Sequence, residues 1–212
     1  HDASLPTTVK LRVIARQQQL LRIDFETRPS QEVLAAKLRD FGERLRETDV
    51  IVLSDYGKGG LAHIAAMIGQ ARSEGCRVLV DPKGDDWARY RGATLVTPNR
   101  SEFRDVAGRW RDEEELAAKA EAVRRDLELE ALLVTRSEEG MSLYTAAGAL
   151  HIPAQAREVY DVSGAGDTVI ATIAALLAAG APLADAVRVA NEAAGVVVGK
   201  LGTAVVHPSE LA

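Results

Sequence analysis

Residues 161–168, with the sequence Asp-Val-Ser-Gly-Ala-Gly-Asp-Thr, have residue types and a spacing suited to phosphoryl transfer. Gly164 and Gly166 stand on either side of Ala165, at the start of an apolar segment that favours a helix. Backbone N–H groups left bare there, at the positive end of the helix dipole, can bind a phosphate. Asp167 follows in the first helical turn, where its carboxylate can accept a proton from an attacking hydroxyl. We interpret the stretch as a phosphate-binding loop with a base beside it.

The same residues also have a purely structural interpretation. Asp161 or Ser163 could cap the helix while the glycines form a tight turn, and an isolated Gly-x-Gly favours that explanation. The rest of the chain must therefore supply a second part of a phosphate site.

Polar side chains follow four apolar segments that read as strands. Ligands of open parallel sheets bind outside the carboxyl ends of the strands, so these side chains are candidates for binding. Each also has a structural alternative: Asp81 before Pro82 can open a turn, Asn99 can cap a helix, and Lys83 can be a solvated loop residue. The four pairs are Asp55 and Lys58, Asp81 and Lys83, Asn99 and Glu102, and Thr135 and Arg136.

Asn99 and Glu102 lie three residues apart at the predicted start of a helix, which places both on one face. An amide and a carboxylate in this arrangement can hold Mg²⁺, mostly through waters that the ion retains. Together with the glycine loop they predict a site for a metal–nucleotide complex.

The elements that must position these residues alternate between buried strands and amphipathic helices, which is typical of an α/β fold with a parallel sheet covered on both faces. A short antiparallel edge is predicted at 141–144 and 150–152. Two alternating segments, 9–15 and 21–25, predict an antiparallel pair that must join a larger sheet or another subunit, because a lone hairpin is marginally stable. The other predicted strands are 49–53, 77–80, 94–97 and 131–135, and the helices are 31–46, 61–74, 113–129, 167–179 and 183–198.

Composition restricts the class of protein. The 212 residues carry a net charge of −5, with 47% hydrophobic and 27% charged residues, so the chain is globular and is not a general nucleic-acid binder. The single cysteine, Cys76, excludes an internal disulfide, and the most apolar segment, 169–179, is too short to span a membrane. We expect a cytoplasmic protein.

With these motifs the chain resembles the ribokinase-like (PfkB) sugar kinases. Residues 161–168 are similar to the carboxyl-terminal signature of that family, and Asn99-x-x-Glu102 is similar to its magnesium motif. The resemblance covers essentially the whole chain. It implies a three-layer α/β/α fold with a mainly parallel sheet, a small β lid at residues 1–28 and a nucleotide-binding core at 29–212. It also implies an ATP-dependent phosphotransferase that acts on an alcohol group.

Longer strings look like the heptose 7-phosphate kinases of this family, which occur alone or fused to a nucleotidyltransferase. The resemblance implies phosphorylation of the C1 hydroxyl of D-glycero-D-manno-heptose 7-phosphate to the 1,7-bisphosphate, on the way to ADP-heptose for lipopolysaccharide. One alternative is a kinase for another sugar or a nucleoside. The other is a nucleotide-binding module without catalysis, which the intact Asp167 argues against because such a module needs no base there. The strings are Lys10-Leu-Arg-Val13, Gln18-Gln-Leu20 with Asp24-Phe25-Glu26, Leu53-Ser-Asp-Tyr56, Asp81-Pro-Lys-Gly84, Tyr90-Arg-Gly-Ala-Thr94 and residues 195–203.

Site residues carried over from the family fall into three groups. Asp167 is the expected catalytic base, with Gly164, Ala165 and Gly166 as the anion hole. Asn99 and Glu102 are expected to order Mg²⁺, and Asp161 with the loop around Gly202 matches a potassium loop, in which Val206 replaces a serine ligand. ATP is expected at Asn99, Thr135, Gly140, Asn191 and Gly202.

The phosphate of the sugar substrate requires cations, and Asp55 is a further substrate candidate. The candidate cations are Lys10, Arg12, Arg16, Lys58, Lys83 and Arg136. Lys83 is preferred because it follows a strand end. Family lids pair between subunits, so we expect a homodimer through the lid. The family's upstream glycine-rich loop and βα units do not occur in this sequence, and we expect that amino-terminal segment to accompany any active protein.

Overall fold

The computed structural model describes residues 5–16, 18–155 and 159–211. Its main sheet has six strands in the order β3-β4-β5-β6-β7-β8. The first four strands run parallel, and β7 and β8 are added antiparallel at one edge, as the sequence predicts. The strands are β3 (Val50–Ser54), β4 (Arg77–Asp81), β5 (Leu95–Val96), β6 (Ala131–Thr135), β7 (Met141–Thr145) and β8 (Gly148–Ile152).

The central strand β5 is shorter than the predicted 94–97 segment, because the side chain of Thr94 replaces a backbone carbonyl as the acceptor of one hydrogen bond between the strands. The backbone N–H of Val78 donates to the hydroxyl Oγ1 of Thr94 at 3.0 Å. The backbone of Thr97 still donates to the carbonyl of Val80, so the segment remains bonded to β4 beyond the ends of β5.

In the described part of the chain six α-helices cover the sheet. They are α1 (Gln31–Arg44), α2 (Ile64–Ser73), α3 (Arg100–Ala107), α4 (Glu113–Asp126), α5 (Ala165–Ala178) and α6 (Leu183–Val198). Five agree with the predicted segments to within a few residues, and α3 begins where Asn99 and Glu102 predicted a helix start. No helix in the described part of the chain is long and apolar enough to cross a membrane.

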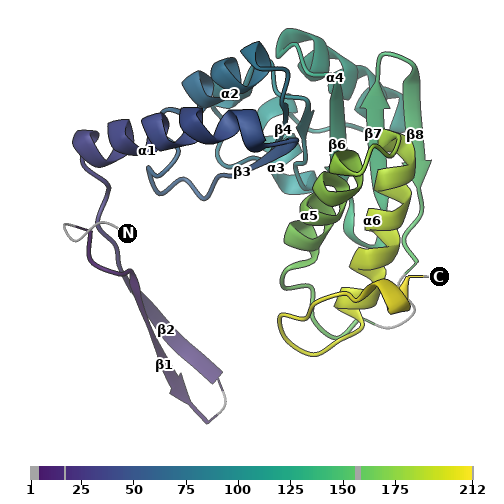
Figure 1. Ribbon diagram of the computed structural model, residues 1–212. Coiled ribbons are helices and arrows are strands. Elements are labelled where there is room, and N and C mark those ends of the chain that lie inside the picture. The colour runs from purple at the N-terminus through teal and green to yellow at the C-terminus, as the bar shows by residue number, and fades with distance from the viewer. Residues whose placement is uncertain (1–4, 17, 156–158, 212) are drawn as a thin grey trace.

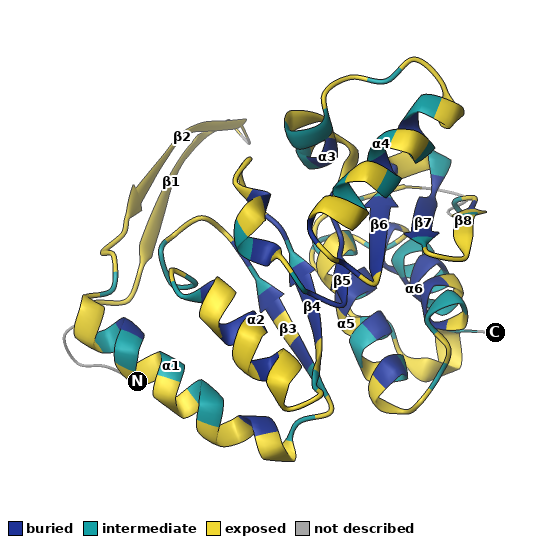
Figure 2. Ribbon diagram, turned by 90° about the horizontal axis from the view of Figure 1, so that it is seen from above, coloured by how far each residue is buried: buried dark blue, intermediate teal, exposed yellow. Residues whose placement is uncertain are grey.

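The helices lie in two layers, one on each face of the sheet. Along β4, Val78 and Val80 belong to a hydrophobic cluster with residues of α2, α3 and α4, whereas Leu79 belongs to a second cluster with α5 and α6. Successive side chains along β4 therefore point into two hydrophobic cores, one on each face of the sheet. This is the expected three-layer arrangement. Figure 2 shows the dark blue strands β4 and β6 among helices whose outer faces are yellow, while the edge strand β8 is largely yellow.

Strands β1 (Val9–Ala15) and β2 (Gln18–Phe25) form a separate antiparallel sheet and do not join the main sheet. The pair extends away from the start of α1 (Figure 1). All its described residues are exposed, and its apolar side chains pair across one face, as in Leu11 opposite Ile23. The predicted pair is thus confirmed, with its apolar face uncovered.

Candidate active site

Helix α5 begins at the glycine stretch without a side-chain cap. Gly164 occupies the N-cap position with φ 81°, in the left-handed region that favours glycine. Asp161 instead accepts from the backbone N–H of Ser163 at 2.8 Å, which closes a local turn before the helix. The alternative interpretation, a helix capped by Asp161 or Ser163, is therefore wrong, and no side chain covers the N–H groups of the first turn of α5.

Space remains open beside this turn. A Cβ added to Gly166 would meet no other atom within 4 Å, and one added to Gly164 would touch only the side chain of Thr203, at 3.7 Å. The backbone N–H of Ala165 donates to the carbonyl of Val162 at 3.2 Å. The other N–H groups of the first turn, which no side chain caps, lie beside this open space, which can receive an anion.

Asp167 lies in the first turn of α5 and is exposed. The hydroxyl of Tyr56, from the loop after β3, donates to its carboxylate oxygen Oδ1 at 3.4 Å. This contact joins two segments that lie 111 residues apart in the sequence.

Asp81, at the end of β4, lies within reach of the charges of carboxylates from both α3 and α5. Burial raises the pKa of its carboxyl to about 6, and the negative charges of Glu102 and Asp167 raise it further, against a hydrogen bond from Ser54. The carboxylates of α3 and α5 therefore act on the same group, so all three share one region. In the sequence, Asp81 is one of several polar residues at the ends of predicted strands. That position is the sequence feature that points to a role for Asp81 in the site.

Asn99 and Glu102 form a capping box at the start of α3. Oδ1 of Asn99 accepts from the backbone N–H groups of Ser101 and Glu102, and Oε2 of Glu102 accepts from the backbone N–H of Asn99. The other carboxylate oxygen, Oε1, lies 3.0 Å from Nζ of Lys83. Asn99 thus caps the helix, as its structural alternative predicts, and holds the Glu102 carboxylate towards the loop after β4.

These residues fit Mg²⁺ as a partner of bound phosphates and not as a closed protein cage. Carboxylate oxygens are the ligands that Mg²⁺ prefers, and it keeps several waters. Within the described residues no group of three or more histidine, cysteine, aspartate or glutamate side chains is placed to hold a metal ion by itself. The remaining ligands would have to come from waters and a nucleotide.

Four of the predicted nucleotide residues lie in two neighbourhoods. Thr135 pairs with Asn99 in a parallel bridge, next to the capping box. Gly140 and Asn191 instead meet the segment after β8: a Cβ on Gly140 would lie 2.1 Å from the carbonyl oxygen of Ile152, and Nδ2 of the buried Asn191 donates to the carbonyl of Pro153 at 2.9 Å.

Gly202 lies beside Asp161, as the predicted potassium loop requires. The backbone N–H of Ser163 holds the pKa of Asp161 below its usual value, and a backbone hydrogen bond from Gly202 adds to this effect. The two residues therefore come together, although they are 41 positions apart in the sequence.

The predicted substrate residues differ in where they point. Asp55 is only 5% exposed and turns inward, accepting from the backbone N–H of Gly57 at 2.8 Å and from the hydroxyl of Tyr90 at 2.9 Å. Lys10 and Lys58 both pair with Glu26 at the end of β2, and this partner raises the pKa of Lys58.

Lys83 reaches the capping box, and Arg12 stands opposite Arg22 on the exposed lid. Arg136 from the end of β6 is buried, and its guanidinium donates to Glu113 at 2.7 Å and also to Glu139. It serves the packing of α4 against the sheet.

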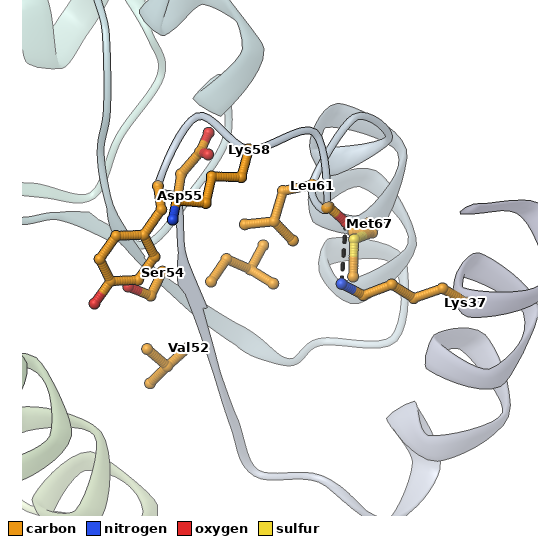
Figure 3. A pocket seen from close by; sticks show the side chains of 10 residues that line it. Lys37, Val52, Ser54, Asp55, Lys58, Leu61 and Met67 are labelled. Atoms are coloured by element: carbon orange, nitrogen blue, oxygen red, sulfur yellow. Dashed lines mark hydrogen bonds between the residues drawn. The ribbon is translucent and has the colours of Figure 1, made fainter. Parts of the chain in front are cut away.

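A cavity of about 570 Å³ opens beside β3, between this strand and the helices α1 and α2. Figure 3 shows Asp55 and Lys58 at one end and Lys37 at the other, where Nζ of Lys37 donates to the carbonyl of Gly60 at 3.0 Å. Val52, 40% exposed on the edge strand β3, forms part of the wall.

The sequence profile of the pfkB family carbohydrate kinases matches residues 1–210. The chain belongs to this family. The D-beta-D-heptose 7-phosphate kinase of Bordetella bronchiseptica is 56% identical over 211 residues, which are 100% of this chain to the nearest per cent and 67% of that protein. The bifunctional protein HldE of Methylococcus capsulatus is 57% identical over 210 residues, 99% of this chain and 44% of its own length.

Solved structures of other proteins share the fold. Phosphofructokinase-2 from Escherichia coli, in complex with potassium, superposes with a TM-score of 0.79 at 18% identity, over 98% of this chain and 69% of its own. Ribokinase from Thermotoga maritima gives 0.77 at 21% identity, over 98% of this chain and 69% of its own. The chain thus spans about two thirds of these structures, and less than half of the HldE relatives.

Proposed function

We propose that the chain is the nucleotide-binding part of an ATP-dependent kinase for D-glycero-D-manno-heptose 7-phosphate. The reaction transfers the γ-phosphoryl group to the C1 hydroxyl and forms the 1,7-bisphosphate used for ADP-heptose. The observation that carries this proposal is the 56% identity to a heptose 7-phosphate kinase along the whole chain.

Asp167 is the proposed catalytic base. A carboxylate is a weak base towards a sugar hydroxyl, so proton transfer must come late, when the bond to the leaving phosphate is largely broken. The backbone of Gly164, Ala165 and Gly166, which no side chain caps, then stabilises the charge on the transferring group, and the N–H of Ala165 exchanges its bond to the carbonyl of Val162 for one to that group. The open space beside Gly166 supports this assignment.

Glu102, oriented by Asn99, and the nearby Asp81 are the proposed oxygen ligands at the metal end. Bound Mg²⁺ would neutralise part of the charge of the ATP phosphates. Because Lys83 pairs with Glu102, we assign Lys83 to binding the phosphoryl group in transfer and no longer to binding the phosphate of the sugar. Lys10, Arg12 and Lys58, towards the lid, remain the candidates for the sugar phosphate, and potassium at Asp161 and Gly202 remains a prediction.

We also propose a homodimer through β1 and β2. The apolar face of this pair includes Val9, Leu11 and Ile23, which are 55%, 49% and 38% exposed. An isolated two-stranded sheet with an open apolar face gains stability when a second sheet covers that face.

The substrate is tested with the complete gene product, Mg-ATP and a panel of acceptors, by measuring ADP formation. We expect heptose 7-phosphate to give a kcat/KM at least about 10²-fold above fructose 6-phosphate, ribose and adenosine, because specificity reflects differential binding of the transition state. Preference for another acceptor would contradict the substrate assignment. ATP binding without transfer to any acceptor would contradict the kinase assignment.

A further inference from the structure

A short 3₁₀ turn, η2 (Trp87–Tyr90), lies against the loop after β3, residues 55–61, and the loop after β4, residues 82–84. The side chain of Tyr90 is fully buried, and its hydroxyl reaches both loops. It lies 2.9 Å from Oδ2 of Asp55, and 3.1 Å from both the backbone nitrogen and the carbonyl oxygen of Lys83. One hydroxyl thus joins two loops that are not adjacent in the sequence.

Other side chains of the same turn hold one loop each. Nε1 of Trp87 donates to the carbonyl of Gly84 at 3.0 Å. Arg89 donates to the carbonyl of Leu61 at 2.6 Å, and its guanidinium lies 3.5 Å from Asp55. These bonds fix η2 against each loop separately, whereas the Tyr90 hydroxyl contacts both.

Each loop carries one contact to the proposed catalytic groups. Tyr56, next to Asp55, donates to the Asp167 carboxylate, and Lys83 pairs with Glu102. The relative position of the two loops therefore determines whether Tyr56 can contact Asp167 while Lys83 contacts Glu102.

We propose that the Tyr90 hydroxyl is a positioning group for phosphoryl transfer, which holds the two loops so that Tyr56 meets Asp167 while Lys83 meets Glu102. The role rests on the proposed kinase function. Tyr90 contacts neither substrate and acts through the two loops.

The chemistry of the hydroxyl suits this role. Burial raises the pKa of Tyr90 to about 12, so the group keeps its proton at neutral pH. Its single hydrogen is donated to the Asp55 carboxylate or to the Lys83 carbonyl, while an oxygen lone pair accepts from the Lys83 N–H. A phenylalanine would keep the ring in the core and leave these groups short of a partner.

The first test is Tyr90→Phe in the complete gene product, assayed with Mg-ATP and heptose 7-phosphate at a temperature where circular dichroism shows every variant folded. Misplacement of reacting groups lowers turnover, so we expect kcat to fall at least about tenfold with both KM values within about threefold. Tyr144→Phe is the control, because Tyr144 is also buried in the first hydrophobic cluster. No described contact joins its hydroxyl to either loop. Unchanged kcat in Tyr90→Phe would overturn the proposal.

A second test separates positioning from a general loss of packing. In a Tyr56→Phe/Lys83→Met background both loop contacts are gone, so Tyr90→Phe should cost less than about a further twofold in kcat. The same factor in both backgrounds would mean that Tyr90 acts only on the fold, and would overturn the proposal. An inactive parent protein would contradict the proposed function instead.

A third measurement needs neither activity nor a folded variant. Hydrogen exchange at the Lys83 amide of the unmodified protein should be slowed at least about tenfold relative to an exposed amide, because its N–H donates to Tyr90. Exchange at the rate of an exposed amide would overturn the tie between the loops.

Discussion

Lys83 and Glu102 lie 3.0 Å apart and join the loop after β4 to the first turn of α3. The Glu102 carboxylate raises the pKa of Lys83, so the ammonium stays charged. Because the Lys83 side chain is still 54% exposed, it can turn towards a bound phosphate without leaving this corner of the site.

Lys83→Ala should therefore act on turnover more than on sugar binding. We expect kcat to fall at least about tenfold and the KM for heptose 7-phosphate to change less than about threefold, because the lost charge faces the transferring group. Steady-state kinetics with each substrate varied in turn measure both values. A raised KM for the sugar phosphate at normal kcat would return Lys83 to the role expected from the sequence.

Asp81 should make stability depend on pH. Its carboxyl has a pKa of about 6 in the folded chain against an ordinary value of 3.8, so the folded state holds the proton more tightly. The free energy of unfolding then falls as the pH rises through this interval. Asp81→Asn should raise Tm by about 2–4 °C at about pH 7.5 and have no effect below about pH 4.

Thermal unfolding followed by circular dichroism at the two pH values measures this difference. Asp85→Asn, at an exposed position four residues further along the chain, should leave Tm unchanged at both. A variant of Asp81 that matches the parent at about pH 7.5 would contradict the raised pKa.

Two glycine substitutions should have opposite consequences. Gly140→Ala places a Cβ 2.1 Å from the carbonyl oxygen of Ile152, so we expect it to lose about 1–3 kcal/mol or more of stability. Gly166→Ala meets open space within a helix and should keep or slightly raise Tm, yet lower kcat at least about tenfold because its methyl group enters the anion site. A fully active Gly166→Ala protein would argue against the cradle.

Assembly can be tested on the lid. Ile23 lies on the apolar face opposite Leu11, so Ile23→Lys should convert a dimer at micromolar concentration into a monomer in sedimentation. Arg22→Gln, at the next position and on the other face, serves as the control. A parent protein that already sediments as a monomer would refute the proposed dimer.

The sequence predicted the α/β layers well because each strand and helix carries its own periodic pattern. It also placed the glycine stretch at a helix start, and the order of the motifs gave the family. These features depend on neighbours along the chain, which is why they could be predicted without a structure.

Contacts between loops could not be predicted in this way. Asp55 had the same strand-end position as Asp81, yet it turns inward because Tyr90, 35 residues later, offers a buried hydroxyl. Asn99 is both a candidate ligand and a helix cap, and only the structure shows that it orients Glu102. Pairings of this kind depend on packing across the sheet and leave no local pattern.

The central claim is that Asp167 moves the proton during phosphoryl transfer. The most direct test is to measure kcat of Asp167→Asn in the complete gene product with Mg-ATP and heptose 7-phosphate. The affinity for ATP is measured by calorimetry on the same variant. Asp185→Asn, which changes an exposed carboxylate of α6, is the control. Asp167→Asn should lose at least about 10²-fold in kcat while the Kd for ATP stays within about threefold. Turnover close to that of the parent protein would contradict the claim.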